Sequence, residues 1–74
     1  MTVTIKLFGI FQKGRFAVEK REYPPSTTVA EIVTDLHIPK AEIGVLMVNS
    51  RHVTLDHSPA ADDVLAIFPV IGGG

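Results

Sequence analysis

The stretch TVAEIVTDL, residues 28–36, has the clearest helical pattern in the sequence. Its apolar side chains are spaced at i, i+3, i+4 and i+7, as in a helix with one buried stripe: Val29, Ile32, Val33 and Leu36. Thr28, with Glu31 three positions later, is the signature of a capping box and predicts the start of the helix. The helix should end before Pro39, because proline disfavours helical geometry in the preceding residue. A single stripe suits a helix that lies across one face of a sheet.

Two predicted strands precede this helix. The segment from Thr2 to Phe11 alternates, and its first face contains Val3, Ile5, Leu7 and Phe11. Gln12-Lys13-Gly14 supplies a short turn, so Arg15 to Tyr23 is predicted to be a second, antiparallel strand. The predicted inward residues of that strand are Phe16 and Val18. We therefore expect a hairpin before the helix.

Further apolar segments follow the helix. Val45 to Val48 is an uninterrupted apolar run, which predicts a strand covered on both faces. Asn49-Ser50 is typical of a tight turn, and Arg51 to Leu55 of a short return strand. Val64 to Val70 should be the last strand, with Pro69 near its end, where a missing hydrogen-bond donor is tolerated. This order of elements predicts a two-layer α+β domain in which the last strand returns beside the first.

Size and composition exclude several classes of protein. A chain of 74 residues forms one domain, near the lower limit for a fold supported by its core alone. The chain has no cysteine, so a disulfide, a thiolate metal site and a cysteine nucleophile are all excluded. A formal charge of -1 argues against nucleic acid as a partner. No apolar run approaches the roughly 20 residues of a membrane span, and we expect a cytoplasmic protein without a membrane partner.

The residues that usually perform catalysis show no suitable spacing. His37, His52 and His57 do not form a metal-ligand motif, so no metal site is expected. No serine or threonine has a nearby histidine and aspartate around a strand-turn-helix elbow, as a nucleophilic hydrolase would require. We therefore expect no catalytic centre within the chain.

The end of the chain is the most informative segment for function. Gly72, Gly73 and Gly74 have no side chains and no preferred φ, so they form a thin and adaptable peptide. Extended, three residues reach about 10 Å, far enough to deliver a terminal carboxylate into a partner's active site. We predict a folded domain at residues 1–71 and a flexible glycine tail at residues 72–74. A loose terminus is the alternative, but the apolar lead-in from Ile67 to Ile71 is costly to leave uncovered.

Together these features resemble the ubiquitin-like β-grasp sulfur carriers, namely the small subunit of molybdopterin synthase (MoaD) and the thiamine-pathway carrier (ThiS). The resemblance extends over nearly the whole chain and is strongest at Val48-Asn49, at Leu55-Asp56, at Asp63 to Val70 and at Gly73-Gly74. Ile67-Phe68-Pro69 and the opening Lys6-Leu7-Phe8 are more similar to the molybdopterin branch. The resemblance implies a β-grasp fold: a mixed sheet of four to five strands with one main helix packed across one face.

The resemblance also implies a mechanism. An E1-like adenylyltransferase of the MoeB or ThiF type would use ATP and Mg to adenylate the carboxylate of Gly74, which a sulfur donor would convert to a thiocarboxylate. The large subunit of molybdopterin synthase would receive this sulfur for the molybdenum or tungsten cofactor. In the alternative branch, a thiazole synthase would receive it. The chain would then be a carrier rather than an enzyme, monomeric when free and without a bound cofactor.

The same resemblance implies the site residues. The reacting group is the carboxylate of Gly74, and the expected partner-binding residues are Gly72, Gly73, Phe68, Pro69, Ile71 and Phe8. Alternation places Phe68 on one face with Val64 and Ala66, a position that fits core packing as well as partner contact. Two other functions remain open: a ubiquitin-like modifier joined to target lysines, and an interaction module with an incidental glycine end.

Overall fold

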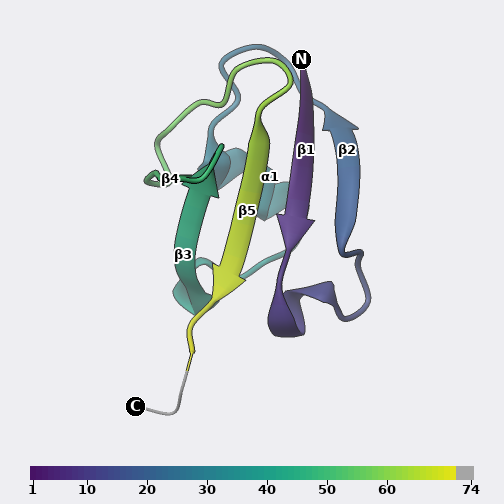
Figure 1. The fold of residues 1–74 in the computed structure, drawn as a ribbon, viewed down its shortest axis with the longest axis vertical. Helices are drawn as coiled ribbons and strands as arrows, with labels where there is room; N and C mark the ends of the chain where they lie inside the picture. Colours follow the sequence, from purple (N-terminus) through teal and green to yellow (C-terminus); the bar gives the residue numbers. More distant parts are fainter. Residues whose placement is uncertain (72–74) are drawn as a thin grey trace.

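A computed structural model describes residues 1–71, in which five strands form one mixed sheet and one α-helix crosses one of its faces (Figure 1). The elements are β1 (Thr2–Leu7), η1 (Gly9–Gln12), β2 (Val18–Glu22), α1 (Val29–Asp35), η2 (Lys40–Glu42), β3 (Ile43–Val48), β4 (Arg51–His52) and β5 (Val64–Pro69). The strand order is β2-β1-β5-β3-β4. Among the strands of residues 1–71, β1 and β5 are the one parallel pair, so the last strand lies beside the first. The predicted ubiquitin-like β-grasp is confirmed.

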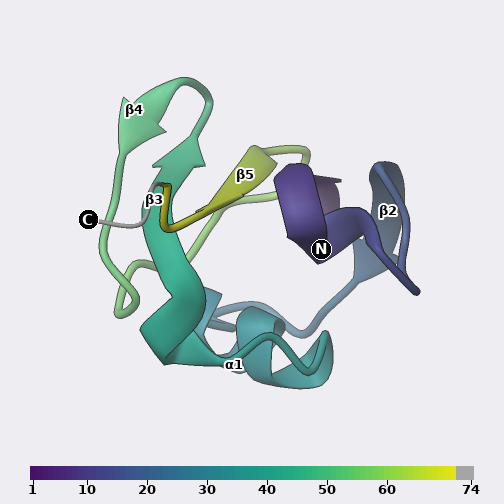
Figure 2. The same ribbon diagram turned by 90° about the horizontal axis from the view of Figure 1, so that it is seen from below.

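Figure 2 shows α1 on one side of the sheet, and the buried side chains of the helix and the strands form the core between them. The predicted helical stripe is buried in full, and so is the predicted inner face of β1. From β5, Leu65 and Ile67 complete the centre of the core. None of the helices in the described part of the chain is long and apolar enough to cross a membrane.

Local sequence signals define both ends of α1. The Thr28 side chain accepts a hydrogen bond from the amide of Glu31 at 3.2 Å, and the Thr28 amide donates to the Glu31 carboxylate at 2.9 Å. The predicted capping box is therefore confirmed. The helix ends before Pro39, as predicted, but the residue that ends it is His37, whose φ is 58°. The amides of His37 and Ile38 donate to carbonyls of the preceding turn at 3.0 Å, as in a Schellman motif.

The first predicted strand is too long. β1 ends at Leu7, and the 3-10 helix η1 begins at Gly9, whose φ is 56°. Phe11 is buried as predicted, but it reaches the core from η1 rather than from a strand. The alternation of apolar residues cannot distinguish a continued strand from a 3-10 helix at this point, because a single turn of 3-10 helix can also return a side chain to the core.

The prediction for Val18 is wrong. This side chain is 58% exposed, and β2 begins at Val18 rather than at Arg15. Val18 pairs with Lys6 of β1, and directly opposite residues share a face of the sheet. That face is the one opposite α1. Phe16 precedes the strand and packs partly against the core, as its predicted inward position requires.

The prediction that β3 is covered on both faces is also wrong. Leu46 and Val48 are buried under α1, whereas Val45 and Met47 remain half-buried on the opposite face. The reason is that the single α-helix of residues 1–71 covers only one side of the sheet. The return strand β4 is limited to Arg51–His52. The tight turn before β4 is confirmed, with φ of 51° and 68° at its two residues.

Candidate partner interface on the open face of the sheet

The sheet face opposite α1, which we call the open face, places Phe68 away from the core. In β5, Leu65 and Ile67 are buried under the helix, so alternation turns Val64, Ala66 and Phe68 to the open face. All three are partly exposed. Phe68 is therefore available for contact with another protein, and the alternative of core packing is excluded.

Phe8 lies against Phe68, as its predicted place in the same patch requires. Their rings are stacked with centroids 4.2 Å apart and an interplanar angle of 9°. The amide of Phe8 donates to the carbonyl of Ile67 at 3.2 Å, which continues the contact between β1 and β5 past the end of β1. This bond brings two aromatic residues from distant parts of the chain together on the open face.

An apolar groove of about 420 Å³ runs beside this aromatic pair. The strands β3, β4 and β5 supply most of its wall and the residues after β5 supply the rest: Gly44, Val45, Met47, His52, Phe68, Pro69, Val70 and Ile71. No partner-binding role is predicted for Val45 and Met47, because their apolar run predicts a strand covered on both faces, or for His52, which the sequence brings up only as a possible metal ligand. Phe68 also lines a neighbouring hollow with Phe8, so it lies between the two concave parts of the open face.

The last described residues, Val70 and Ile71, form part of the same groove. Val70 and Ile71 are 58% and 88% exposed, and the amide of Val70 donates to the carbonyl of Glu42 at 2.9 Å. Figure 1 shows that β5 ends beside the start of β3. Four of the predicted partner-binding residues are thus found at one end of the open face: Phe8, Phe68, Pro69 and Ile71. Gly72, Gly73 and Gly74 lie outside the described residues, and the division at residue 71 stays a prediction.

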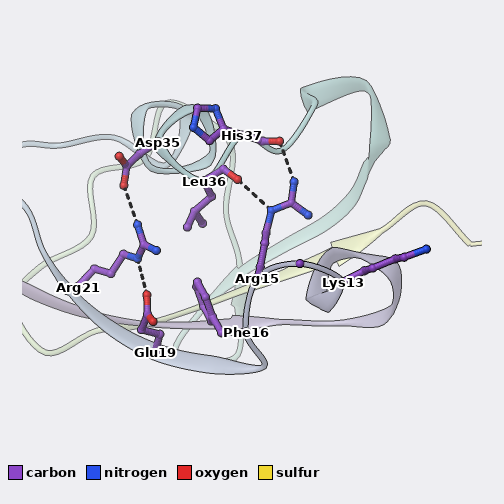
Figure 3. Close-up of a pocket in the computed structure, with 9 residues that line it drawn as sticks. Lys13, Arg15, Phe16, Glu19, Arg21, Asp35, Leu36 and His37 are labelled. Atoms are coloured by element: carbon purple, nitrogen blue, oxygen red, sulfur yellow. Dashed lines mark hydrogen bonds and ion pairs between the residues drawn. The ribbon is translucent and has the colours of Figure 1, made fainter.

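A second pocket, of about 440 Å³, lies on the helix side of the molecule (Figure 3). Arg15 holds the C-terminal end of α1 there, because its Nε donates to the Leu36 carbonyl at 2.9 Å and its Nη2 to the His37 carbonyl at 2.8 Å. A guanidinium at the last carbonyls of a helix satisfies acceptors that have no partner within the helix. The role of Arg15 is therefore to fasten the loop before β2 to the helix.

Three charged residues that line this pocket, Glu19, Arg21 and Asp35, are paired with one another. Arg21 contacts the carboxylates of Glu19 at 2.6 Å and Asp35 at 3.3 Å (Figure 3). Tyr23 donates its hydroxyl to Asp35 at 2.9 Å. Burial and this hydrogen bond to Asp35 raise the pKa of Tyr23 to about 12. The arrangement joins β2 and Tyr23 to α1. No local pattern predicts it, because Glu19, Arg21 and Tyr23 lie 12 to 16 positions before Asp35.

The histidines are not gathered into a metal site in the described part of the chain. Residues 1–71 contain no group of three or more histidine, aspartate or glutamate side chains placed to hold a metal ion. The groove on the open face, by contrast, is lined mostly by apolar side chains and includes the last described residues, Val70 and Ile71. The geometry therefore suits binding of another protein along this groove.

Comparison with known proteins agrees with this geometry. The model of the ThiS family matches residues 5–74. The fold is similar to a putative molybdopterin converting factor subunit 1 from Pyrococcus furiosus, with 24% identity, a TM-score of 0.77, and 96% of this chain and 99% of that chain covered. It is also similar to small archaeal modifier protein 1 of Haloferax volcanii, with 19% identity, a TM-score of 0.76, and 95% and 98% covered.

A third similar structure is a complex of subunits 1 and 2 of molybdopterin-converting factor from Helicobacter pylori, with 16% identity, a TM-score of 0.68, and full coverage of both chains. The comparison with curated proteins found no match. Identities this low support the fold, whereas the family model extends over nearly the whole sequence. The chain belongs to the ThiS family of ubiquitin-like β-grasp sulfur carriers.

Proposed function

We propose that this chain carries sulfur as a thiocarboxylate on Gly74 and donates it in molybdopterin biosynthesis. The observation that supports the proposal is the continuity between the groove and the chain end. Phe68, Pro69, Val70 and Ile71 form one wall of the groove, and Gly72, Gly73 and Gly74 come directly after them in the sequence. A partner that covers the groove therefore receives the residues that lead directly to the terminal carboxylate.

The proposed chemistry needs nothing from the chain except a carboxyl group and a docking surface. A carboxylate oxygen of Gly74 attacks the α-phosphate of ATP in an E1-like adenylyltransferase of the MoeB or ThiF type, and pyrophosphate leaves. A sulfide-level nucleophile then attacks the carbonyl carbon and expels AMP, which leaves the thiocarboxylate. ATP and Mg²⁺ belong to the partner. The absence of cysteine is compatible with this route, because the sulfur is held on the main chain.

The chain is therefore a carrier in this scheme and not an enzyme on its own. The large subunit of molybdopterin synthase would be the second partner, where the thiocarboxylate sulfur attacks a pterin precursor. The sequence Ile67-Phe68-Pro69 favours this branch over the thiamine branch, in which a thiazole synthase would accept the sulfur. Transfer of sulfur to only one of the two acceptors in a reconstituted reaction would choose between the branches.

Intact-mass measurement tests the carrier proposal. The chain is incubated with its activating enzyme, MgATP and a sulfide source, and we expect the mass gain that corresponds to replacement of one oxygen by sulfur. The matched control is the chain extended by one alanine after Gly74, which moves the reactive carbon and should gain no sulfur. Sulfur incorporation into the extended chain, or no gain in the parent under conditions that release pyrophosphate, would contradict the proposal.

Attachment to lysine side chains is the second candidate function. The fold is shared with a protein that is named as a modifier, and an acyl-adenylate can also react with an amine instead of a sulfur nucleophile. The same reaction, supplemented with target proteins, distinguishes the two functions. Isopeptide-linked products would favour the modifier, and a thiocarboxylate without such products would favour the carrier.

A further inference from the structure

Two glycines from different segments of the fold lie against Pro69, the last residue of β5. A Cβ atom on Gly44 of β3 would lie 2.7 Å from the carbonyl oxygen of Pro69 and 3.0 Å from the Cα of Val70. A Cβ atom on Gly9 of η1 would lie 3.1 Å from the Cγ of Pro69. These separations are shorter than ordinary contacts between non-bonded heavy atoms. Both positions therefore leave no room for a side chain unless Pro69 moves.

The close approach at Gly44 results from a bulge in β3. Ile43 pairs with Pro69 and Val45 pairs with Phe68, so Gly44 is an extra residue without a partner in β5. A bulge of this kind bends the strand and interrupts regular pairing. Pro69 itself has no amide hydrogen to donate. The chain after β5 is instead held by the bond from the Val70 amide to the Glu42 carbonyl at 2.9 Å.

We propose that Gly9 and Gly44 are positioning residues that form a slot for Pro69 and so keep Val70 and Ile71 in the wall of the apolar groove. The exposure of Val70 and Ile71 shows that packing alone does not hold them there. The hydrogen bond from the Val70 amide to the Glu42 carbonyl holds these residues in place, and this bond requires the close approach of the two segments that Gly44 permits. This inference deepens the proposed function and rests on it, because the slot prepares the residues before Gly74 for the activating partner.

The two glycines act on different parts of Pro69. At Gly44 the obstacle is main chain, so the methyl group of Gly44→Ala must displace the Pro69–Val70 peptide by roughly 0.5 Å or more to reach normal contact. At Gly9 the obstacle is the proline ring. Gly9 also has a φ of +56°, which strains any other residue, and Gly14 with a φ of +71° shares this strain but has no atom within 4 Å of its Cβ position. Gly14→Ala is therefore the matched control for Gly9→Ala.

The first experiment measures the slot directly by amide hydrogen exchange and ¹H–¹⁵N NMR of the isolated chain. Gly44→Ala and Gly9→Ala should both shift the Val70 amide resonance, and Gly44→Ala should accelerate its exchange on the order of tenfold. The amide of Leu65, in the core strand β5, serves as the reference for global unfolding. In each variant its exchange rate should change only as much as the measured free energy of unfolding requires. Gly14→Ala should leave the Val70 amide unchanged.

The second experiment measures sulfur loading by the activating enzyme. Because a displacement far from the reacting atoms can cost one to two orders of magnitude, we expect Gly44→Ala to raise KM about tenfold while kcat changes less than about twofold. Combining Pro69→Ala with Gly9→Ala removes the ring that obstructs the new methyl group. Gly9→Ala should therefore have little effect in the Pro69→Ala background, whereas Gly44→Ala should retain its full effect.

The outcomes separate the slot from the proposed function. An unchanged Val70 amide in both Gly9→Ala and Gly44→Ala would overturn the slot. A displaced amide together with parental KM would overturn the positioning role. If the parent chain acquires no sulfur, the proposed function fails, and the amide measurement still decides whether the slot exists.

Discussion

Replacing Phe68 by alanine should weaken partner binding much more than it weakens the fold. The ring is stacked on Phe8 with centroids 4.2 Å apart and is only partly buried. Such a pair contributes about 0.5–1.5 kcal/mol beyond its buried area, and a half-buried ring loses less on truncation than the 3–5 kcal/mol typical of a fully buried one. We therefore expect the free energy of unfolding to fall by about 1–2 kcal/mol, measured by urea denaturation with circular dichroism.

The stacking contribution can be isolated with a double-mutant cycle. Phe8→Ala, Phe68→Ala and the double variant are compared by urea denaturation. If the rings contact each other as observed, the sum of the stability losses in the two single variants should exceed the stability loss in the double variant by about 1 kcal/mol. Additive losses would show that the two rings do not interact in solution.

The effect on binding should be larger. Phe68 lines both concave parts of the open face, so it occupies the centre of the proposed interface. Truncation of a central aromatic residue commonly costs about 2 kcal/mol, which corresponds to about a 30-fold increase in Kd. Isothermal titration calorimetry with the activating enzyme measures this value. The large synthase subunit provides a second, independent titrant.

Val18→Ala is the control on the same face of the sheet. Val18 is exposed and apolar, but it lies on the edge strand β2 and outside the groove. We expect its stability to stay within about 0.5 kcal/mol of the parent and its Kd to be unchanged. Parental affinity in Phe68→Ala, or an equal loss in Val18→Ala, would refute the assignment of the groove as the docking surface.

Arg15→Met should lower the free energy of unfolding by about 2 kcal/mol in urea denaturation, because it leaves two carbonyls at the end of α1 without their charged donor. Thr28→Ala should lower the free energy of unfolding by about 1 kcal/mol in the same assay, because the helix loses its N-cap. A free energy of unfolding equal to that of the parent would contradict this prediction. Hydrogen bonds from the Ala60 amide and then from Asn49 lower the pKa of Asp63. The ionised Asp63 therefore contributes to the free energy of unfolding above the pKa of about 4 that aspartate has in the unfolded chain. This contribution is lost as the pH falls through the lower pKa of Asp63 in the folded protein. Unfolding measured from pH 6 to pH 2 should show this loss in the parent but not in Asp63→Asn, and equal pH profiles would contradict it.

The helix could be predicted closely because its determinants are local. Thr28 and Glu31 are three residues apart and form their capping contacts without help from the rest of the fold. The tight turn after β3 is local in the same sense. The predictions of side-chain burial were wrong where the pairing of two distant segments determines which face of the sheet a residue occupies. Val18 was assigned to the core because its neighbours alternate, but its pairing with Lys6 places it on the open face.

The candidate site was also predictable only in part. Phe8 and Phe68 were both named from the sequence, and the structure brings their rings together. Val45 and Met47 were missed, since a continuous apolar run has the same appearance whether one or both faces are covered. The slot around Pro69 has no signal in the sequence, because Gly44 and Pro69 are 25 positions apart and neither is unusual in its own segment.

The capped helix, the apolar alternation of the strands and the turn at Asn49-Ser50 could be predicted because each depends on residues within a few positions of one another. The packing of α1 was needed to show which sheet face is covered, and therefore that Phe68 is partly exposed while Ile67 is buried. Alternation defines two faces of a strand but does not distinguish the buried face from the open one. Strand register and helix packing supply that distinction, and they depend on contacts between distant parts of the chain.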